Sequence, residues 1–314
     1  MAMRTAAVDT QAATAAVRQS LRGRRFDPKG LVFESLLVLA LLLSLGVLVT
    51  LLAQVFSDGI GVLADRPGSF LTGKLSTVSA LVAGVGQGIQ GSLLLMLVVA
   101  VVAFPLGIGA AVYLEEYAHD TRFSRFININ IRNLAGVPSI VYGLLGLSIF
   151  VQVLGGFTGG KSVIAGGLTL AVLVLPIVII TAAEALRAVP ESIREAGYGV
   201  GATRWQVIRS HVLPSAAPGI LTGTVLAISR ALGETAPLLV VGAVTGFLAT
   251  GGASFWQQMQ GAYTSLPTII FRWSKLPQES FRELAAAAII VLLAVTLLAN
   301  ATAIILRNRY ERKW

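Results

Sequence analysis

The sequence predicts an all-α membrane protein with six transmembrane helices, and two properties of the chain lead to this conclusion. Of its 314 residues, 55% are hydrophobic and only 12% are charged. The mean hydropathy is +0.80, and a water-soluble domain of this length could not bury that much apolar surface. Six separate apolar segments also have the length of about 20 residues that a spanning helix needs.

The six apolar segments divide the chain into a membrane domain with a polar tail at each end. The predicted spans cover residues 31–55, 89–113, 131–154, 163–186, 217–247 and 284–306. Residues 1–30 form a basic tail, residues 31–306 the membrane domain, and residues 307–314 a short C-terminal tail. Arginine is concentrated in both tails and in the loops 114–130 and 187–216. The positive-inside rule therefore places these regions, and both termini, in the cytoplasm.

Composition also argues against several classes of function. The formal charge of +9 lies mostly in loops between apolar runs, which favours a role in orienting the spans over nucleic-acid binding. The sequence has no cysteine, which excludes disulfides, thiolate metal sites and cysteine catalysis. His119 and His211 are far apart in polar loops and make a poor metal pair. We expect no cofactor, no metal and no enzymatic activity.

Residues 155–162, GGFTGGKS, match the phosphate-binding loop pattern G-x-x-x-x-G-K-[ST]. Such a loop follows a buried strand and precedes a helix in a soluble nucleotide-binding domain. Here it joins two predicted spans on the outer side. We therefore expect no nucleotide to bind there.

The last outer loop, residues 248–283, is rich in aromatic side chains and allows two interpretations. These side chains could form an aromatic belt at the membrane surface. They could equally form an outer gate and part of a docking face for a soluble partner. The aromatic residues are Phe255, Trp256, Tyr263, Phe271, Trp273 and Phe281.

The cytoplasmic loop 187–216 is predicted to form two short helices with a glycine break. Pro190 suits the first turn of one helix, and a second helix over residues 203–211 is expected to stop at Pro214. The stretch resembles the cytoplasmic signature of importer-type ABC permeases, E-A-A, three residues, G, nine residues, I-x-L-P. Gly197 stands in place of the second alanine and His211 in place of the isoleucine. The residues in register are Glu195, Ala196, Gly201, Leu213 and Pro214.

That resemblance implies a mechanical role for residues 195–201. In the family, this element is a coupling helix that seats in a groove of the ATPase subunit. A short capped helix makes a rigid lever, and glycine lets it sit flush against a partner. The alternative is an ordinary amphipathic surface loop.

Arg230 and Glu234 carry charge into the fifth predicted span. At positions i and i+4 of a helix they would share one face, along with the small residues Gly219, Gly223 and Ala227. A charged side chain at the membrane centre costs about 2.5 to 3.5 kcal/mol on insertion scales. The pair is therefore either a structural lock between helices or an anion site, because a guanidinium suits phosphate oxygens.

Two stretches, LAGVPSIVYGLLG at 134–146 and SRALGETAP at 229–237, are similar to the permease subunits of the bacterial phosphate-specific ABC transporter. Six spans and a short outer loop favour the PstA-like permease over its PstC-like sibling. The resemblance implies a type I ABC importer permease fold in the bacterial cytoplasmic membrane, and Arg230 and Glu234 in the substrate pathway. It also implies as partners a second permease subunit, two ATP-binding subunits and an extracytoplasmic phosphate-binding protein.

Two other functions are compatible with parts of this pattern. A permease for another oxyanion, such as sulfate or molybdate, would share the cytoplasmic signature. A channel or carrier that works without ATP would not need that signature. A membrane enzyme would need a cluster of catalytic acids or histidines, which the spans lack.

Overall fold

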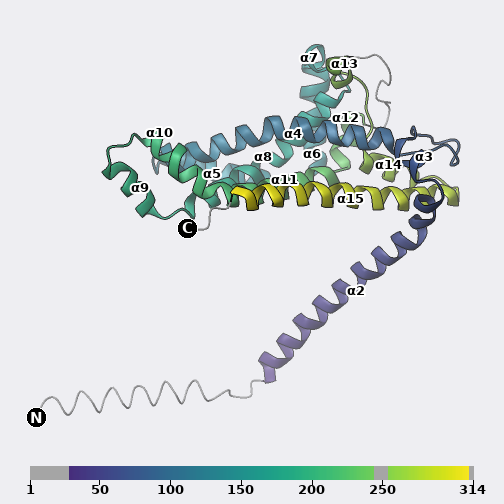
Figure 1. Ribbon diagram of the computed structural model, residues 1–314, viewed down its shortest axis with the longest axis horizontal. Helices are drawn as coiled ribbons and strands as arrows, with labels where there is room; N and C mark the ends of the chain where they lie inside the picture. Colours follow the sequence, from purple (N-terminus) through teal and green to yellow (C-terminus); the bar gives the residue numbers. More distant parts are fainter. Residues whose placement is uncertain (1–27, 244–253, 311–314) are drawn as a thin grey trace, which may run out of the picture. The chain divides into compact units, whose positions relative to one another are not determined.

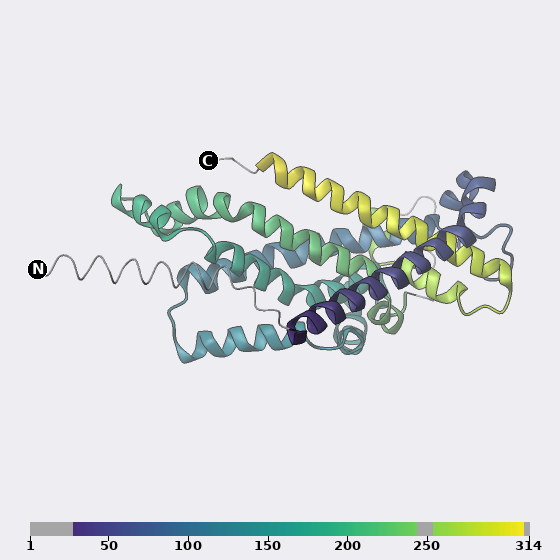
Figure 2. The same ribbon diagram turned by 90° about the horizontal axis from the view of Figure 1, so that it is seen from below.

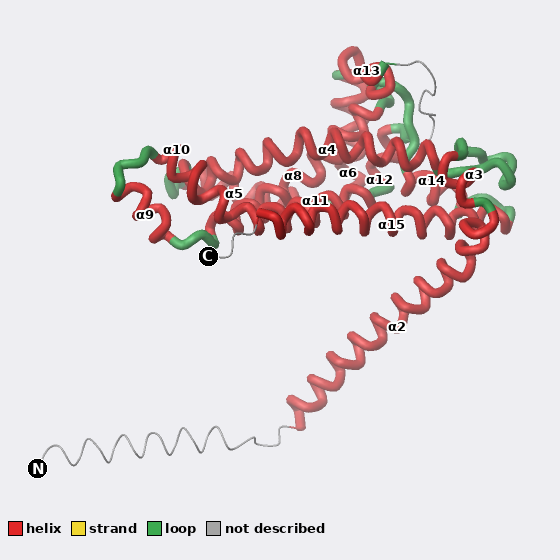
Figure 3. Tube along the Cα trace, viewed as in Figure 1, coloured by secondary structure: helices red, strands yellow, loops and turns green. Residues whose placement is uncertain are grey.

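The computed structural model describes residues 28–243 and 254–310, and they fall into two units divided after Gln54. Every regular element in these ranges is helical, with no strand among them (Figure 3). Five helices are long and apolar enough to cross a membrane, or six if one bent pair counts as a single span. The predicted all-α membrane fold is confirmed. The count of six spans requires the bent pair, which is the third span in chain order.

The first unit contributes the residues 28–54, which belong to helix α2 (Pro28–Asp65). All of them are exposed and most are apolar, as lipid-facing side chains are. The helix contains the predicted first span, 31–55. Most of the predicted tail, residues 1–27, lies outside the described part of the chain.

Four long helices of the second unit lie side by side (Figures 1 and 2). They are α4 (Gly86–Val112), α8 (Val163–Arg187), α11 (Leu213–Gly233) and α15 (Glu279–Tyr310). Helix α8 is the most buried of them and packs against both α4 and α11. Glycine permits the close contact: a Cβ at Gly107 of α4 would lie 2.6 Å from Cγ1 of Val178 on α8.

The third predicted span, 131–154, is not a single straight helix. Helix α5 (Arg122–Ala135) is followed by α6 (Ser139–Gly146) and the π-helix η2 (Leu147–Val153), and the axis bends by 101° between them. Gly136 ends α5, and Pro138 begins the next helix. Because proline disfavours helical backbone at the residue before it, the helix breaks here. The Tyr142 hydroxyl spans the bend and donates to the Leu134 carbonyl at 2.8 Å.

The fifth span begins earlier and ends earlier than the predicted 217–247. It runs as one helical stretch from Arg204 to Gly233, through α10 (Arg204–Val207), the π-helix η3 (Ile208–Val212) and α11. The prediction that Pro214 stops a short second helix is wrong. The π-turn before Pro214 widens the hydrogen-bond ladder where proline lacks an N–H, so the helix continues. Phe247, the predicted end, lies outside the described residues.

The two ends of the second unit differ in character (Figures 1 and 2). One end carries α9 (Glu191–Gly199), α10 and the last turns of α15. The other carries α3 (Pro67–Thr72) and α14 (Leu266–Trp273). At this second end Trp273 lies between Phe70 and Phe281, with ring centroids 6.3 and 6.4 Å away.

The aromatic residues of the last outer loop divide into two groups. Phe255 and Trp256, on α13 (Phe255–Met259), and Phe271, on α14, are exposed, as an aromatic belt requires. Tyr263, Trp273 and Phe281 are fully buried, and the Trp273 indole N–H donates to the Ser76 carbonyl at 2.9 Å. A belt on the surface therefore does not describe these three, which form part of the core.

Candidate functional site

Arg230 and Glu234 meet at the end of α11. Arg230 lies in the last turn of the helix, and Glu234 follows in extended backbone (φ −75°, ψ 121°). The two residues therefore do not share a helical face as predicted. Gly233 ends the helix, and Pro237 can occupy only the first turn of the next one, α12 (Ala236–Val241). The charged pair nevertheless forms, with Arg230 Nε 3.4 Å from Glu234 Oε1.

The ion pair is loose, and the guanidinium is accessible. Its nitrogen–oxygen separation of 3.4 Å exceeds the range of about 2.7 to 2.9 Å typical of charge-assisted hydrogen bonds. The Arg230 side chain is 44% exposed, against 16% for Glu234. Arg230 therefore offers donors to a further anion, and Glu234 holds it by one weak contact.

The small residues of α11 lie on the same side of the helix as Arg230, one or more turns before it, and pack against α8. A Cβ at Gly219 would lie 2.7 Å from Cβ of Ala185 on α8, and Ala227 is buried. On another side, the Ser229 hydroxyl lies 2.6 Å from Oδ1 of Asn300 on α15. The small-residue stripe is therefore a helix interface, and α11 is held between α8 and α15 while Arg230 stays exposed.

The two stretches that carry the sequence resemblance, 134–146 and 229–237, lie against each other. Gly143 of α6 approaches Pro237 of α12 so closely that a Cβ at position 143 would be 2.7 Å from the Pro237 Cα. Tyr142, one residue earlier, lies within electrostatic range of Arg230. The bend between α5 and α6 thus brings a segment about 90 residues away in sequence to the charged pair.

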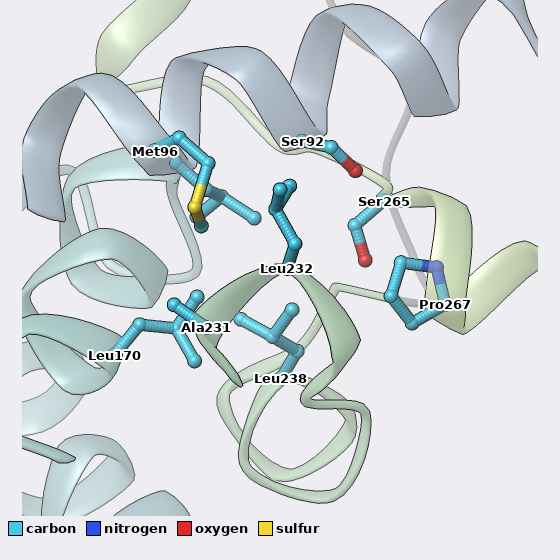
Figure 4. Close-up of a pocket in the computed structure, with 9 residues that line it drawn as sticks. Ser92, Met96, Leu170, Ala231, Leu232, Leu238, Ser265 and Pro267 are labelled. Atoms are coloured by element: carbon cyan, nitrogen blue, oxygen red, sulfur yellow. The ribbon is translucent and has the colours of Figure 1, made fainter. Parts of the chain in front are cut away.

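A narrow space lies beside the residues that follow Arg230 (Figure 4). It is too small for a water molecule. Leu232 is at the centre of its lining, with Met96 on one side and Ser265 on the other. In this conformation the helices close on one another at this level. The lining residues are Ser92, Leu95, Met96, Leu170, Ala231, Leu232, Leu238, Ser265 and Pro267.

The predicted coupling helix, residues 195–201, lies on α9 and the turn after it. Glu195 and Ala196 are exposed. Gly197 is buried, and a Cβ there would be 2.7 Å from Cγ2 of Val207 on α10. Gly201 adopts φ +82° in open space. The predicted glycine break is therefore present at one end of the second unit (Figure 1), but the helix that follows it is the beginning of the fifth span rather than a second short helix.

Leu213 and Pro214 are placed differently from the rest of the signature. They form the first turn of α11, inside the fifth span rather than in a loop. The exposed face of α9 and the charged pair are thus joined by one helical stretch that begins at Arg204, where Thr203 caps it with a reciprocal Gln206 contact.

Sequence reasoning missed a group of ionic contacts where α9 meets the ends of α4 and α8. Glu115 and Glu116 lie in the π-helix η1 (Tyr113–Tyr117) that ends α4. Arg187, the last residue of α8, pairs with Glu115, and Arg194 of α9 pairs with Glu116 at 2.7 Å. The available signal was two adjacent carboxylates at the end of an apolar span, where the helix dipole disfavours negative charge.

The GGFTGGKS segment has the wrong surroundings for a phosphate-binding loop. The π-helix η2 precedes it, where such a loop needs a strand. Its first four residues form the one-turn helix α7 (Gly155–Thr158), and the Ser162 hydroxyl accepts from Ala165 N at 3.2 Å as the N-cap of α8. Within the described residues, no three of the side chains of His, Asp or Glu come together as a metal site would require.

The chain is similar to membrane subunits of transporters. Residues 103–313 match the family described as binding-protein-dependent transport system inner membrane component. The probable ABC transporter permease protein YqgI of Bacillus subtilis is 34% identical over 63% of this chain and 65% of its own length. The phosphate transport system permease protein PstA of Yersinia pestis is 38% identical over 69% and 70%. PstA 1 of Mycobacterium tuberculosis is 37% identical over 71% and 70%.

Solved structures share the fold at low identity. The inward-facing MetNI methionine ABC transporter has a chain with a TM-score of 0.56 and 18% identity, covering 73% of this chain and 96% of that one. A bacterial ABC transporter for import of the acidic polysaccharide alginate gives 0.54 and 16%, covering 72% and 79%. The predicted type I importer permease fold is confirmed.

Proposed function

This chain belongs to the family of binding-protein-dependent transport system inner membrane components, and on that premise we propose that it is a permease subunit that carries inorganic phosphate into the cell. The observation that carries the proposal is the joint position of two sequence stretches. Residues 134–146 and 229–237 resemble phosphate permeases, and they pack together around an accessible arginine. The phosphate transport relatives, at 37 to 38% identity, support the same substrate.

Arg230 supplies the chemistry that an oxyanion needs. A guanidinium stays charged at every physiological pH and presents several N–H donors in a fixed plane that fits phosphate oxygens. Glu234 keeps the arginine from binding too tightly, because conduction requires an ion that leaves as readily as it enters. The carboxylate can also accept a hydrogen bond from a protonated phosphate.

The chain itself carries out no ATP chemistry in this proposal. Hydrolysis takes place in two ATP-binding subunits, which contact the exposed face of α9 through Glu195, Ala196 and the turn at Gly201. A second permease subunit completes the pathway, and a phosphate-binding protein delivers the ion outside the cytoplasmic membrane. Both termini lie in the cytoplasm, on the side of the arginine-rich loops.

Transport then follows alternating access. ATP binding draws the ATPase subunits together and moves α9, and the spans reorient so that the outer side opens to phosphate. Hydrolysis and separation of the ATPase subunits open the inner side. The tight closure of Leu232 and its neighbours is a barrier that one of these movements must open.

Uptake by the reconstituted complex tests the proposal. The chain is co-expressed with the second permease subunit and the ATPase, co-purified and placed in vesicles that contain the phosphate-binding protein. Labelled phosphate uptake is then measured with ATP and competing sulfate or molybdate. We expect ATP-dependent uptake that excess sulfate and molybdate do not suppress, and its loss in Arg230→Gln with assembly intact. Preferential uptake of another oxyanion, or uptake without the ATPase, would contradict the proposal.

A further inference from the structure

Helix α9 is tied to the end of α4 by a buried ion pair. Arg194 Nη2 lies 2.7 Å from Glu116 Oε1, and its Nε lies 3.3 Å from the same oxygen. The two side chains are only 12% and 4% exposed. The hydrogen bond to Glu116 raises the pKa of the Arg194 guanidinium, which therefore stays charged at any physiological pH.

Arg194 also holds the end of α8. Its Nη1 donates to the Val189 carbonyl at 2.9 Å, and its Nη2 to the Leu186 carbonyl at 3.0 Å. These carbonyls belong to the last turn of α8 and the short link to α9, where helix termini leave acceptors without partners. One guanidinium thus joins three elements, α4, α8 and α9.

No other polar contact ties α9 to α4 in the described residues. Helix α9 also packs on α10 and η3, where Gly197 lies against Val207, and Ile193 packs on the apolar cluster that includes Val112 at the end of α4. Glu191, the other carboxylate near Arg194, is 71% exposed and belongs to α9 itself. Without the Glu116 pair, α9 would have only apolar packing near the end of α4, which fixes its position less strictly than a charge-assisted hydrogen bond does.

We propose that Arg194 is a positioning residue that locks the coupling helix to α4 through Glu116, so that a displacement of α9 moves the α4 span rather than bending the loop. The pair lies at one end of α4. The residues Ser92 and Met96, which line the closed space beside Leu232, lie about 30 to 36 Å away along the same helix, at 1.5 Å per residue. A rigid helix carries the movement over that distance.

This inference rests on the proposed function, because it assumes that an ATPase displaces α9. It predicts a specific defect: the ATPase still docks and hydrolyses ATP, but hydrolysis no longer drives transport. A residue needed only for folding would instead lower assembly, hydrolysis and uptake together.

The first test measures phosphate moved per ATP hydrolysed by the complex in vesicles. In Glu116→Gln and Arg194→Gln we expect the ratio to fall about fivefold or more, the lower end of usual coupling between sites, with hydrolysis retained. Arg194→Lys keeps the charge and should recover part of the ratio. The matched control is Arg125→Gln, which breaks the ion pair to Asp120, 66% and 83% exposed, and should leave the ratio unchanged.

The second test follows the lock itself and does not depend on the substrate. The chain has no cysteine, so spin labels at Tyr113→Cys on η1 and Ser192→Cys on α9 are the only labels on it when the chain is labelled before assembly with its partners. In the assembled complex we expect a narrow label-to-label distance distribution that is the same with and without ATP. Adding Glu116→Gln should broaden it.

The outcomes separate the two proposals. If the parent complex moves no phosphate, the proposed function fails, and the label distances still decide whether the lock exists. If the parent complex transports but Glu116→Gln keeps both the narrow distribution and the normal ratio, this inference is wrong. If the single variants fail to assemble, the double variant Arg194→Gln with Glu116→Gln is measured in their place, because it leaves no unpaired buried charge. Its phosphate-to-ATP ratio and its label distances are then judged by the same criteria.

Discussion

Gly143 and Pro237 are in backbone contact: a Cβ added at Gly143 would lie 2.7 Å from the Pro237 Cα and 3.2 Å from its carbonyl oxygen. The two residues belong to the two stretches that resemble phosphate permeases, and they join α6 to α12. Because neither obstructing atom belongs to a flexible side chain, a methyl group at 143 must push the helices apart. This contact fixes α12, and with it the chain segment that carries Glu234.

Gly143→Ala should therefore lower both stability and transport. Overpacking of this kind costs about 1 to 3 kcal/mol, and displacement of α12 should change the geometry of the Arg230–Glu234 pair. Thermal unfolding in detergent and vesicle uptake measure the two effects. Gly109→Ala, in α4, is the control because nothing lies within 4 Å of its Cβ position. Equal behaviour of the two variants would show that the contact is unimportant.

The sequence predicts the core spans well and the broken ones poorly. The predicted span 163–186 agrees with α8 (Val163–Arg187). This segment is apolar on all sides and is buried as one helix, so its apolar limits coincide with the helix limits. The sequence analysis does not predict the bend of 101° between α5 and α6, although Gly136 and Pro138 lie within the predicted third span. Hydropathy measures how apolar a segment is and contains no direction, whereas the bend depends on contacts such as Gly143 with Pro237.

The candidate site shows the same limit. Charge within an apolar segment is conspicuous and makes Arg230 and Glu234 candidates from the sequence alone, and the two side chains pair even though the helix ends between them. Arg194 and Glu116 are 78 residues apart, and nothing local in the sequence links them. A buried ion pair between distant segments becomes visible only in the folded chain.

The double variant Arg230→Gln with Glu234→Gln distinguishes an anion site from a structural ion pair. Because the Arg230–Glu234 contact is long, at 3.4 Å, the thermal midpoints of both single variants should change little. Loss of charge-assisted bonds to phosphate should reduce uptake about tenfold or more in Arg230→Gln. For a structural lock, the double variant would regain the uptake that each single variant loses; we expect no such recovery.

Gly201 should accept asparagine better than valine. Its φ of +82° lies in the left-handed region, where asparagine is tolerated and a β-branched side chain is strained. No atom lies near its Cβ position, so backbone conformation alone decides the order. The strain in Gly201→Val should be about 1 to 3 kcal/mol and should weaken ATPase co-purification more than Gly201→Asn does. The reverse order would mean that side-chain size at the ATPase contact matters more than backbone conformation.

Gly197 stands in this chain where the family signature has alanine. Its surroundings predict that a larger side chain at 197 requires a smaller one at Val207. A Cβ at 197 would lie 2.7 Å from Cγ2 of Val207 and 3.2 Å from its Cγ1. Gly197→Ala alone should therefore displace α9 from α10, at a cost of about 1 to 3 kcal/mol, and reduce ATP-driven uptake. Val207→Ala removes both obstructing methyl groups.

The double variant Gly197→Ala with Val207→Ala should regain much of the stability and uptake lost in Gly197→Ala. Val207→Ala alone should leave a small cavity, because Val207 is fully buried. A double-mutant cycle on thermal unfolding measures the exchange, and residues in contact typically couple by about 0.5 to 3 kcal/mol. Additive effects would show that Gly197 and Val207 do not limit each other's size, and that α9 and α10 pack differently in the assembled transporter.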